Sequence, residues 1–468
     1  MSLIPGGHVR DRFVYRQVFQ EVWCGRLRSS WWKRPAGVVL LSACLWESAA
    51  AAANENCFVG TYHLADGSDV DVAASDGGHL RWRRKDGTSG QLTRLSADDW
   101  KSTLGWTDRP DGKSVSFDCK HHRIVFAGKP GELIPFDVTE TRFAGAGVEL
   151  AGRLVMPKGN EKAPIVVLVH GAEHDSAREN YALQRLFPSA GIGAFVYDKR
   201  GTGASGGQYT QDYLILADDA IAAKREAKRL AGVRAGRIGY QAGSQGGWVA
   251  PLAATIEPVN FVIVGFGLAV SPLEEDREAI VSDMTRHAFD AAIVKKALKV
   301  ADATAAVLLS DFREGYDNLA AVKREYGGEP WFKYLHGNFS FVILEKSPAE
   351  LREIGPTLLP GIPLQYDPMP VLQNLETQQL WILGEDDIDA PSAETARRLK
   401  ELAAVRPITV AVFPHAEHGI YEYETAPDGT RLSTRQPDGY FQMMRDFIFH
   451  GRIGPSYGTA RISEPRKH

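Results

Sequence analysis

The hydrophobic pattern changes once along the chain, near residue 146. Before that point, short runs of alternating apolar and polar residues are separated by turn-forming residues. Asp-Gly pairs interrupt these runs at four places, namely Asp66-Gly67, Asp76-Gly77, Asp86-Gly87 and Asp111-Gly112. Because Asp-Gly between short runs is typical of β-hairpins, the pattern predicts a small antiparallel β-domain over residues 55–145.

From residue 146 onward, uninterrupted apolar runs rich in Val and Ile alternate with helical patterns. Runs without alternation are typical of strands buried on both faces, as in parallel sheets. Such runs occur at residues 165–169, 194–197, 261–264, 380–383 and 408–412. Residues 237–240 are also expected to form a strand, and helical patterns lie at residues 212–231, 246–256 and 392–404. The alternation predicts an α/β domain over residues 146–450, with a mostly parallel sheet.

One long stretch breaks this alternation. Residues 274–353 show helical patterns and no run of the buried-strand type. We therefore expect a helical cap inserted at about residues 270–375. Residues 451–468 follow the last helical pattern as a C-terminal tail.

Composition and charge exclude several classes of protein. With 44% hydrophobic and 24% charged residues, the 468-residue chain is unlike disordered, collagen-like or coiled-coil proteins. The formal net charge is −4 and the pI is about 6.4. Since this charge lacks a basic signature, we expect no nucleic-acid partner.

The N-terminal segment is typical of an export signal. Basic Lys33 and Arg34 precede an apolar run at residues 36–45, and small residues follow at 48–53. About ten apolar residues are too few to span a bilayer, which needs about 20. We expect residues 1–53 to be a signal peptide or leader, and the mature chain to be periplasmic or secreted without a stable membrane span.

Two schemes for processing this leader remain open. Cleavage near Ala53 would release the protein from the membrane, whereas Leu41-Ser42-Ala43-Cys44 resembles a bacterial lipobox and would leave a lipidated Cys44. Beyond the leader only Cys57 and Cys119 remain. An even pair in an exported chain makes one disulfide plausible, with two free thiols as the alternative.

A strand-to-helix turn carries the sharpest chemical signal. Its sequence is Gly239-Tyr240-Gln241-Ala242-Gly243-Ser244-Gln245-Gly246-Gly247. A serine on such a turn is exposed as a nucleophile, and the next amide, that of Gln245, points at an oxyanion. Ala242 stands where the pattern G-x-S-x-G has its first glycine, which is a mild departure because a methyl group is small. The segment predicts Ser244 as the nucleophile, against an ordinary Gly-rich turn.

A serine nucleophile needs a base, and the base needs an acid that orients it. After the strand predicted at 380–383 comes the acidic run Gly384-Glu385-Asp386-Asp387-Ile388-Asp389. The carboxyl end of a strand is where open α/β sheets place their sites. We expect Asp387 to be the acid, with Asp386 and Asp389 as competitors.

The base is expected in the loop after the strand at 408–412. This loop contains His415 and His418. His418 is followed by a glycine and fits the loop pattern of a catalytic histidine better than His415. The catalytic prediction is therefore Ser244, Asp387 and His418.

A second oxyanion donor is expected at the end of the first buried strand, in Val169-His170-Gly171-Ala172. The backbone N–H of Ala172 would act with that of Gln245, and His170 would brace the loop. Residues 198–205 contain glycines but neither a P-loop Lys-Ser/Thr nor a complete G-x-G-x-x-G, which disfavours dinucleotide binding. No motif implies a cofactor or a metal.

Together these motifs resemble the α/β-hydrolase superfamily over about residues 146–450. The resemblance rests on His170-Gly171, on Asp198-Lys199-Arg200-Gly201-x-Gly203-x-Ser205, on Ala242-Gly243-Ser244-Gln245-Gly246-Gly247 and on the Asp387/His418 pair. The chain is similar to bacterial esterases and to prolyl-oligopeptidase-like or serine-aminopeptidase-like hydrolases with an extra N-terminal domain. The resemblance implies an eight-strand, mostly parallel sheet and a covalent acyl-enzyme.

Three functions follow from these observations. The first is an exported hydrolase of carboxylic esters. The second is a serine peptidase on the same triad, acting on a peptide with Glu173 as a candidate anchor for a free α-amine. The third is a non-catalytic binding protein on a hydrolase scaffold. The β-domain would restrict access, bind a polymer or mediate dimers, and the sequence leaves the oligomeric state open.

Overall fold

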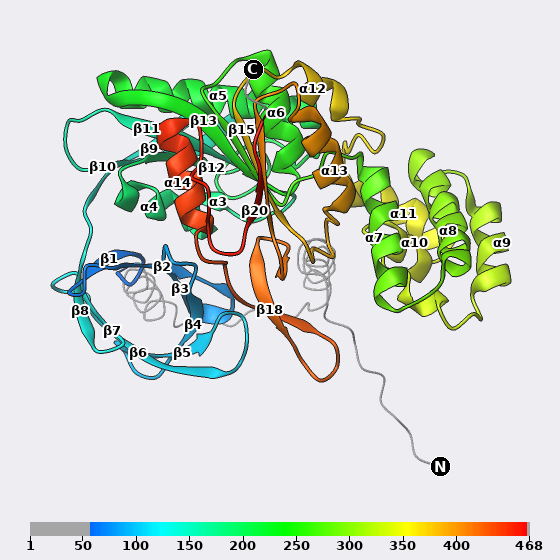
Figure 1. Cartoon of the computed structure of the whole chain (residues 1–468), viewed down its shortest axis with the longest axis horizontal. Helices are drawn as coiled ribbons and strands as arrows, with labels where there is room; N and C mark the ends of the chain where they lie inside the picture. Colours follow the sequence, from blue (N-terminus) through cyan, green and yellow to red (C-terminus); the bar gives the residue numbers. More distant parts are fainter. Residues whose placement is uncertain (1–56, 466–468) are drawn as a thin grey trace, which may run out of the picture.

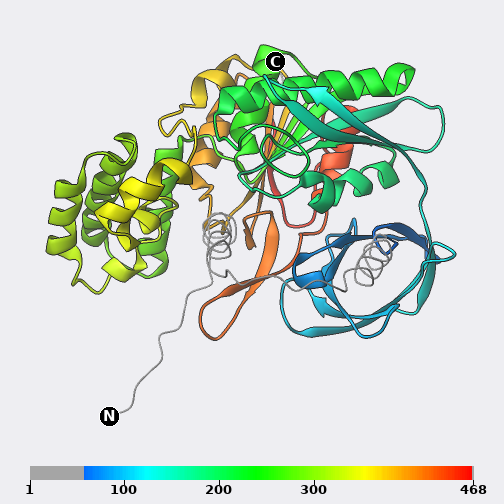
Figure 2. The ribbon, with the colours of Figure 1, turned by 180° about the vertical axis from the view of Figure 1, so that it is seen from behind.

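The computed structural model describes residues 57–465. It contains a β-barrel, a nine-stranded sheet with helices on both faces, and a helical cap beside the sheet (Figure 1). The view from behind shows the barrel and the cap at opposite ends of the molecule (Figure 2). The predicted leader, with its alternative lipidation site Cys44, lies outside the described residues.

The N-terminal domain is a closed antiparallel barrel of eight strands. These are β1 (Gly60–Leu64), β2 (Asp69–Ala74), β3 (Leu80–Arg83), β4 (Ser89–Arg94), β5 (Asp99–Leu104), β6 (Pro110–Asp118), β7 (Arg123–Phe126) and β8 (Lys129–Leu133). β1 pairs with both β2 and β8, which closes the barrel. Closure removes the exposed edges that an open sheet of short strands would carry. The predicted antiparallel β-domain is thus present, in the form of a barrel.

Aromatic residues fill much of the barrel interior. The Phe58 ring lies 4.8 Å from that of Phe117 and 5.5 Å from that of Trp100. A disulfide joins Cys57 to Cys119, with Cα atoms 5.5 Å apart, and both cysteines pack against this core. The start of the barrel is therefore tied to the end of β6.

A buried ion pair attaches the barrel to the sheet domain. Arg185, on α4 (Leu183–Leu186), donates from Nε to Asp71 Oδ1 at 2.6 Å and from Nη2 to Asp71 Oδ2 at 2.9 Å. Asp71 lies on β2 and is completely buried, and its Oδ1 also accepts from Thr61. A two-point contact of this kind fixes orientation as well as distance.

The second domain is built on a nine-stranded sheet of order β20-β16-β15-β14-β13-β11-β12-β10-β9. The strands are β9 (Phe136–Ala144), β10 (Glu149–Pro157), β11 (Ala163–Val169), β12 (Gly193–Tyr197), β13 (Ala235–Gly243), β14 (Val262–Gly265), β15 (Gln379–Gly384), β16 (Ile408–Phe413) and β20 (Arg461–Ser463). Neighbours from β12 through β16 pair in parallel, while β9, β10 and β20 add antiparallel pairs. The predicted α/β class with a mostly parallel sheet is confirmed.

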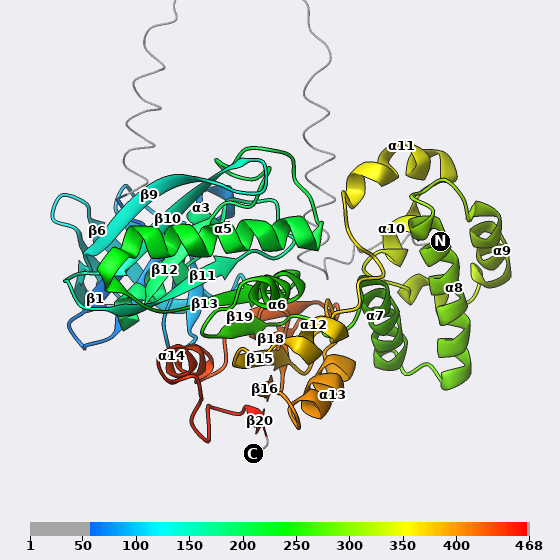
Figure 3. The same cartoon turned by 90° about the horizontal axis from the view of Figure 1, so that it is seen from above.

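Helices cover both faces of this sheet (Figure 3). Besides α4 they are α3 (Ala177–Asn180), α5 (Tyr213–Ala231), α6 (Gly246–Ile256), α12 (Met369–Asn374), α13 (Ala393–Leu402) and α14 (Tyr440–His450). The predicted helix at 212–231 is α5, and Asp212 caps it by accepting from two amides of its first turn.

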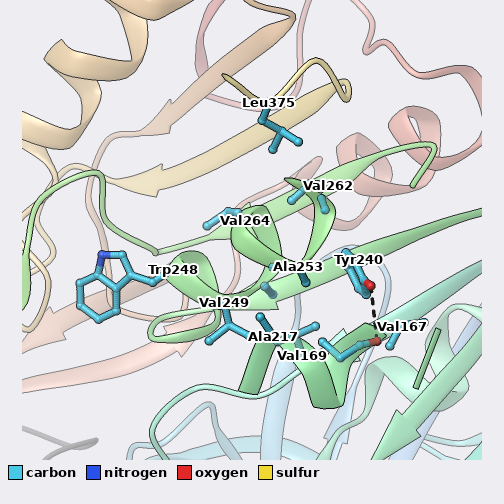
Figure 4. Close-up of a cluster of buried hydrophobic side chains, with 14 of the residues drawn as sticks. Val167, Val169, Ala217, Tyr240, Trp248, Val249, Ala253, Val262, Val264 and Leu375 are labelled. Carbon is cyan, nitrogen blue, oxygen red and sulfur yellow. Dashed lines mark hydrogen bonds between the residues drawn. The ribbon is translucent and has the colours of Figure 1, made fainter. Parts of the chain in front are cut away.

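Side chains of each central strand alternate between two buried cores. On β11, Val167 and Val169 pack under α5 and α6, whereas Val166 and Leu168 pack under α4 and α14. Figure 4 shows part of the first core, in which Trp248 of α6 lies near Val249 and Val264. Burial on both faces explains why these strands are apolar without alternation.

The cap is a separate helical layer with its own apolar core. It contains α7 (Pro272–Arg286), α8 (Ala291–Leu309), α9 (Tyr316–Tyr326), α10 (Ser340–Glu345) and α11 (Pro348–Leu358). It enters after β14 and leaves before β15, as the sequence pattern predicts. Among the described residues, no helix combines the length and the apolar character needed to cross a bilayer.

Three details differ from the expectations. β9 lies within the predicted β-domain but pairs along nine residues with β10, so it belongs to the large sheet. Its alternation is that of an edge strand, which resembles a barrel strand in sequence.

The sheet has nine strands instead of eight, because β20, in the predicted tail, adds to β16. Asp111-Gly112 lies inside β6, at a register shift in the ladder, and not between two strands.

Replacing both Cys57 and Cys119 by alanine should lower the free energy of unfolding of the barrel by about 4 kcal/mol, because the bond closes a loop with a sequence separation of 62 residues. Urea unfolding followed by tryptophan fluorescence measures this change. Reduction of the wild-type protein should produce the same loss. Equal midpoints for the variant and the oxidised wild type would contradict the prediction.

Candidate active site

Ser244 lies on a sharp turn between β13 and α6. Its φ is +51°, a region that residues other than glycine rarely adopt. Ser244 N donates to Gly265 O at 3.2 Å, and Gly247 N donates to Ser244 O at 2.8 Å. The side chain is partly exposed. These contacts hold the turn in a strained conformation at the carboxyl end of β13, the kind of turn that exposes a nucleophile in enzymes.

Small neighbours make this turn possible. A Cβ atom on Gly246 would lie 2.7 Å from His170 O, so any side chain there would collide with the backbone that follows β11. Ala242 is completely buried, and its methyl group is accommodated beside Gly246. The departure from G-x-S-x-G therefore leaves the turn intact.

The loop after β16 and the loop after β15 meet in a buried hydrogen bond. His418 Nδ1 lies 2.9 Å from Asp387 Oδ2, with side chains 10% and 1% exposed. Asp387 Oδ1 accepts from the amides of Asp389 and Ala390 at 3.0 and 2.8 Å. With Nδ1 donating to the carboxylate, Nε2 is the ring atom that can take up a proton.

The environment of His418 favours the protonated ring. Burial disfavours the imidazolium, but the charge of Asp387 and the hydrogen bond to it outweigh burial and raise the pKa of His418 to about 9. Asp389 and Glu275 act in the same direction. The neutral form that serves as a base therefore becomes more abundant as the pH rises.

The competing candidates have other contacts. Asp386 Oδ2 accepts from Tyr423 Oη at 2.9 Å, and its nearest imidazole nitrogen is that of His415 at 3.5 Å. The His415 side chain is 89% exposed. Asp387 is thus the carboxylate of this loop whose hydrogen bond reaches His418.

Ser244 and His418 each contact one short segment, formed by Gly265 at the end of β14 and Phe266 after it. Gly265 accepts the Ser244 amide, and the Phe266 ring lies 4.9 Å from the His418 ring. A Cβ on Gly243 would touch the same Phe266 ring. The structure therefore brings the predicted nucleophile and base to the same part of the sheet edge.

The predicted oxyanion loop lies against the Ser244 turn. A Cβ on Gly171 would lie 3.5 Å from Gly243 O. Lys199, 2% exposed, donates from Nζ to Gly171 O at 2.7 Å, and Tyr209 Oη donates to Ala172 O at 2.7 Å. Because a trans peptide is planar, fixing Gly171 O also fixes the direction of the Ala172 N–H on the opposite side of that peptide.

Both oxyanion candidates have supporting neighbours. Gln245 is buried at the start of α6, where amides lack partners within the helix, and its side chain donates to Gln211 Oε1 at 2.7 Å. His170 Nε2 lies 2.7 Å from Tyr197 O, so this histidine braces the loop as expected. Burial lowers the pKa of Lys199 to about 8.

Sequence reasoning missed one acidic residue of this site. Glu275, in the first turn of α7, is 4% exposed, and its Oε2 has no hydrogen-bond partner. Burial raises the pKa of Glu275 to about 8, while the charge of nearby His418 opposes this rise. In the sequence it belongs to Glu274-Glu275-Asp276, which fits the ordinary acidic first turn of a helix. Only the fold shows that it faces His418.

Glu275 is also connected to the acid loop. Asn338 Nδ2 donates to Glu275 Oε1 at 2.9 Å and to Asp389 O at 2.7 Å. The cap therefore contacts the same loop that holds Asp387. A movement of the cap would therefore displace the loop that holds the Asp387 carboxylate, which hydrogen-bonds to His418.

The sheet order, with Ser244 between β13 and α6 and with Asp387 and His418 after β15 and β16, decides the fold. The chain has an α/β-hydrolase fold. Functions vary widely within one fold, so activity has to be argued from the site.

Comparison with known proteins finds similar solved structures at low sequence identity and low TM-score. No family model and no curated protein matches the chain. An esterase from Pyrococcus furiosus is 16% identical with a TM-score of 0.39, covering 61% of this chain and 83% of that one. The acylaminoacyl peptidase of Pyrococcus horikoshii is 16% identical with a TM-score of 0.40, covering 84% and 58%. An α/β hydrolase from a Penicillium species is 19% identical with a TM-score of 0.40, covering 60% and 91%.

Replacing Asp387 by asparagine should bring the pKa of His418 from about 9 to below its ordinary value of 6.5, because burial remains while the stabilising charge is lost. NMR titration of the labelled imidazole measures this shift. Asp386→Asn is the matched control and should leave the titration of His418 near 9. An unchanged titration in Asp387→Asn would show that another group governs the ring.

Proposed function

We propose that the chain is a serine hydrolase that cleaves carboxylic esters. Ser244 is the nucleophile, His418 the general base and Asp387 the residue that orients the base. The observation that carries this proposal is the buried Asp387–His418 hydrogen bond, 2.9 Å long, beside the strained Ser244 turn. A partly exposed serine, an oriented imidazole and two candidate oxyanion amides are the groups that acyl transfer requires.

The reaction follows from these positions. His418 Nε2 takes the proton of the Ser244 hydroxyl as its Oγ attacks the ester carbonyl. The N–H groups of Gln245 and Ala172 stabilise the tetrahedral oxyanion. His418 then gives the proton to the departing alcohol, which leaves an acyl group on Ser244. Water, activated by the same imidazole, releases the acid and restores the serine.

We further propose that this hydrolase is exported. The basic, apolar and small-residue segments of the leader support this proposal. The Cys57–Cys119 disulfide supports it independently, since such bonds persist in oxidising compartments.

Ser244→Ala should reduce hydrolysis of p-nitrophenyl acetate by more than about a thousandfold, because the acyl-enzyme cannot form. A spectrophotometric assay measures the rate, and circular dichroism checks the fold. His415→Ala is the matched control and should retain wild-type activity. A fluorophosphonate probe should label Ser244 in the wild type. A wild type that neither turns over esters nor accepts the probe would favour the non-catalytic binding protein.

One observation favours a peptidase as the second candidate. The carboxyl groups of Asp387, Asp389 and Glu275 all lie near enough to raise the pKa of His418. Burial raises the pKa of Glu275 to about 8, and a cationic amine bound beside it would favour its ionised form. Glu173 is already engaged, since its Oε1 accepts from Tyr181 Oη. Glu275 keeps a free buried oxygen and is therefore the better anchor for a substrate α-amine.

If the substrate carries a free α-amine, Glu275→Gln should lower kcat/KM for an aminoacyl p-nitroanilide by about 10–100-fold, the value of one charge-assisted hydrogen bond. The loss on p-nitrophenyl acetate, which has no amine, should be much smaller and limited to the effect of Glu275 on the pKa of His418. Glu274→Gln is the matched control, because Glu274 pairs with Arg398. Equal losses on both substrates would exclude an amine anchor, and absent anilide cleavage would leave the esterase.

A further inference from the structure

The loop that carries His418 continues into a small sheet outside the nine-stranded one. This sheet contains β17 (Ala416–Glu417), β18 (Tyr421–Thr425) and β19 (Arg431–Arg435). His418 lies between β17 and β18. Figures 1 and 2 show the β18–β19 hairpin between the sheet domain and the barrel. We call residues 416–436 the histidine hairpin.

The barrel binds this hairpin through backbone hydrogen bonds. Trp106 N, in the turn after β5, donates to Ser433 O at 2.8 Å, and Gln436 N donates to Gly87 O at 2.9 Å. Gly105 has φ +51°, and a Cβ there would lie 2.3 Å from Thr434 O. The barrel turn and the hairpin backbone are therefore in direct contact at Gly105, where there is no room for a side chain.

The Trp106 ring is the centre of the contact. The Arg81 guanidinium lies 4.0 Å from the centroid of the Trp106 ring, and the Tyr421 ring lies 4.5 Å from it at an interplanar angle of 63°. Arg81 is buried and donates from Nη1 to Gly105 O at 2.8 Å. The tryptophan is thus packed between a cation of the barrel and a ring three residues beyond His418.

The hairpin transmits this contact to both neighbours of His418. Ser433 Oγ donates to Glu417 Oε1 at 2.6 Å, and Gln436 Nε2 donates to Gly419 O at 3.3 Å. Ser433 and Gln436 are the residues whose backbones bind the barrel. The segment on each side of the imidazole is therefore held by a residue that the barrel holds.

We propose that the N-terminal barrel is a brace for the catalytic histidine, and that Trp106 is a positioning residue that acts through the histidine hairpin. This inference rests on the proposed role of His418. Catalytic groups have to be held within about 0.5 Å of their productive position. Without its contacts to the barrel, the histidine hairpin keeps its hydrogen bonds to the sheet domain. It loses the rigid body that limits its movement. The barrel then has a role within the reaction, in place of the access, polymer-binding or dimer roles considered above.

The test compares four variants on p-nitrophenyl acetate. Trp106→Ala should lower kcat by about 10–100-fold, the effect of misplacing a catalytic group by about 1 Å, with KM changed less than about twofold. Trp106→Phe keeps a ring against Tyr421 and should restore most of the rate. Arg109→Ala removes an exposed ion pair with Glu424 at the same interface and is the matched control, with wild-type kinetics expected. Tyr421→Leu removes the edge-to-face ring contact from the hairpin side and should repeat the loss.

A second readout separates the brace from a general loss of stability. Loosening the hairpin weakens the Asp387–His418 contact, so the pKa of His418 in Trp106→Ala should move from about 9 toward 6.5. NMR titration of the imidazole, at a temperature where the protein is folded, measures this shift. This readout does not need turnover, so it tests the brace even if the wild type shows no Ser244-dependent hydrolysis, which would defeat only the proposed function. Wild-type kcat and an unchanged His418 titration in Trp106→Ala would overturn the brace. If Trp106→Ala fails to fold, Tyr421→Leu decides between the same two outcomes.

Discussion

The hydrogen bond between Asp387 and His418 is the contact on which the arrangement of this molecule depends. It joins loops from two neighbouring parallel strands at one edge of the sheet. Burial would normally keep the imidazole neutral, and the charge of Asp387 and the hydrogen bond to it, together with Asp389 and Glu275, reverse this preference. The sheet sets the spacing of the two loops, the cap touches the acid loop through Asn338, and the barrel holds the histidine hairpin.

Much of the sheet domain could be predicted because its signals are local. A strand buried on both faces is apolar throughout, so β11, β14, β15 and β16 are visible as runs rich in Val, Ile and Leu. The Ser244 turn is visible for the same reason, since a strand, small residues and a helix follow one another within a dozen positions. Asp387 and His418 were found from their places after predicted strands, and the structure adds the hydrogen bond between them.

The remaining features depend on contacts between distant residues. β9 alternates like a barrel strand, and only its pairing with β10 assigns it to the large sheet. Glu275 belongs to an ordinary acidic helix start until the fold brings it to His418. Trp106 lies more than 300 residues before Tyr421 in the chain, and nothing in either local sequence indicates the edge-to-face contact of their rings. Closure of the barrel is likewise a property of the β1–β8 pair and not of any single strand.

The position of the histidine hairpin has a consequence for biosynthesis. Domains fold as units during synthesis, with N-terminal units first. The barrel can therefore have its aromatic core in place while the hairpin that docks on it is still to be made. The histidine loop is completed against a preformed template late in synthesis. On this view, a nascent or truncated chain that contains Ser244 but ends before the histidine hairpin has no oriented imidazole. Such a chain would gain hydrolytic activity only after the hairpin has been made and has docked on the barrel.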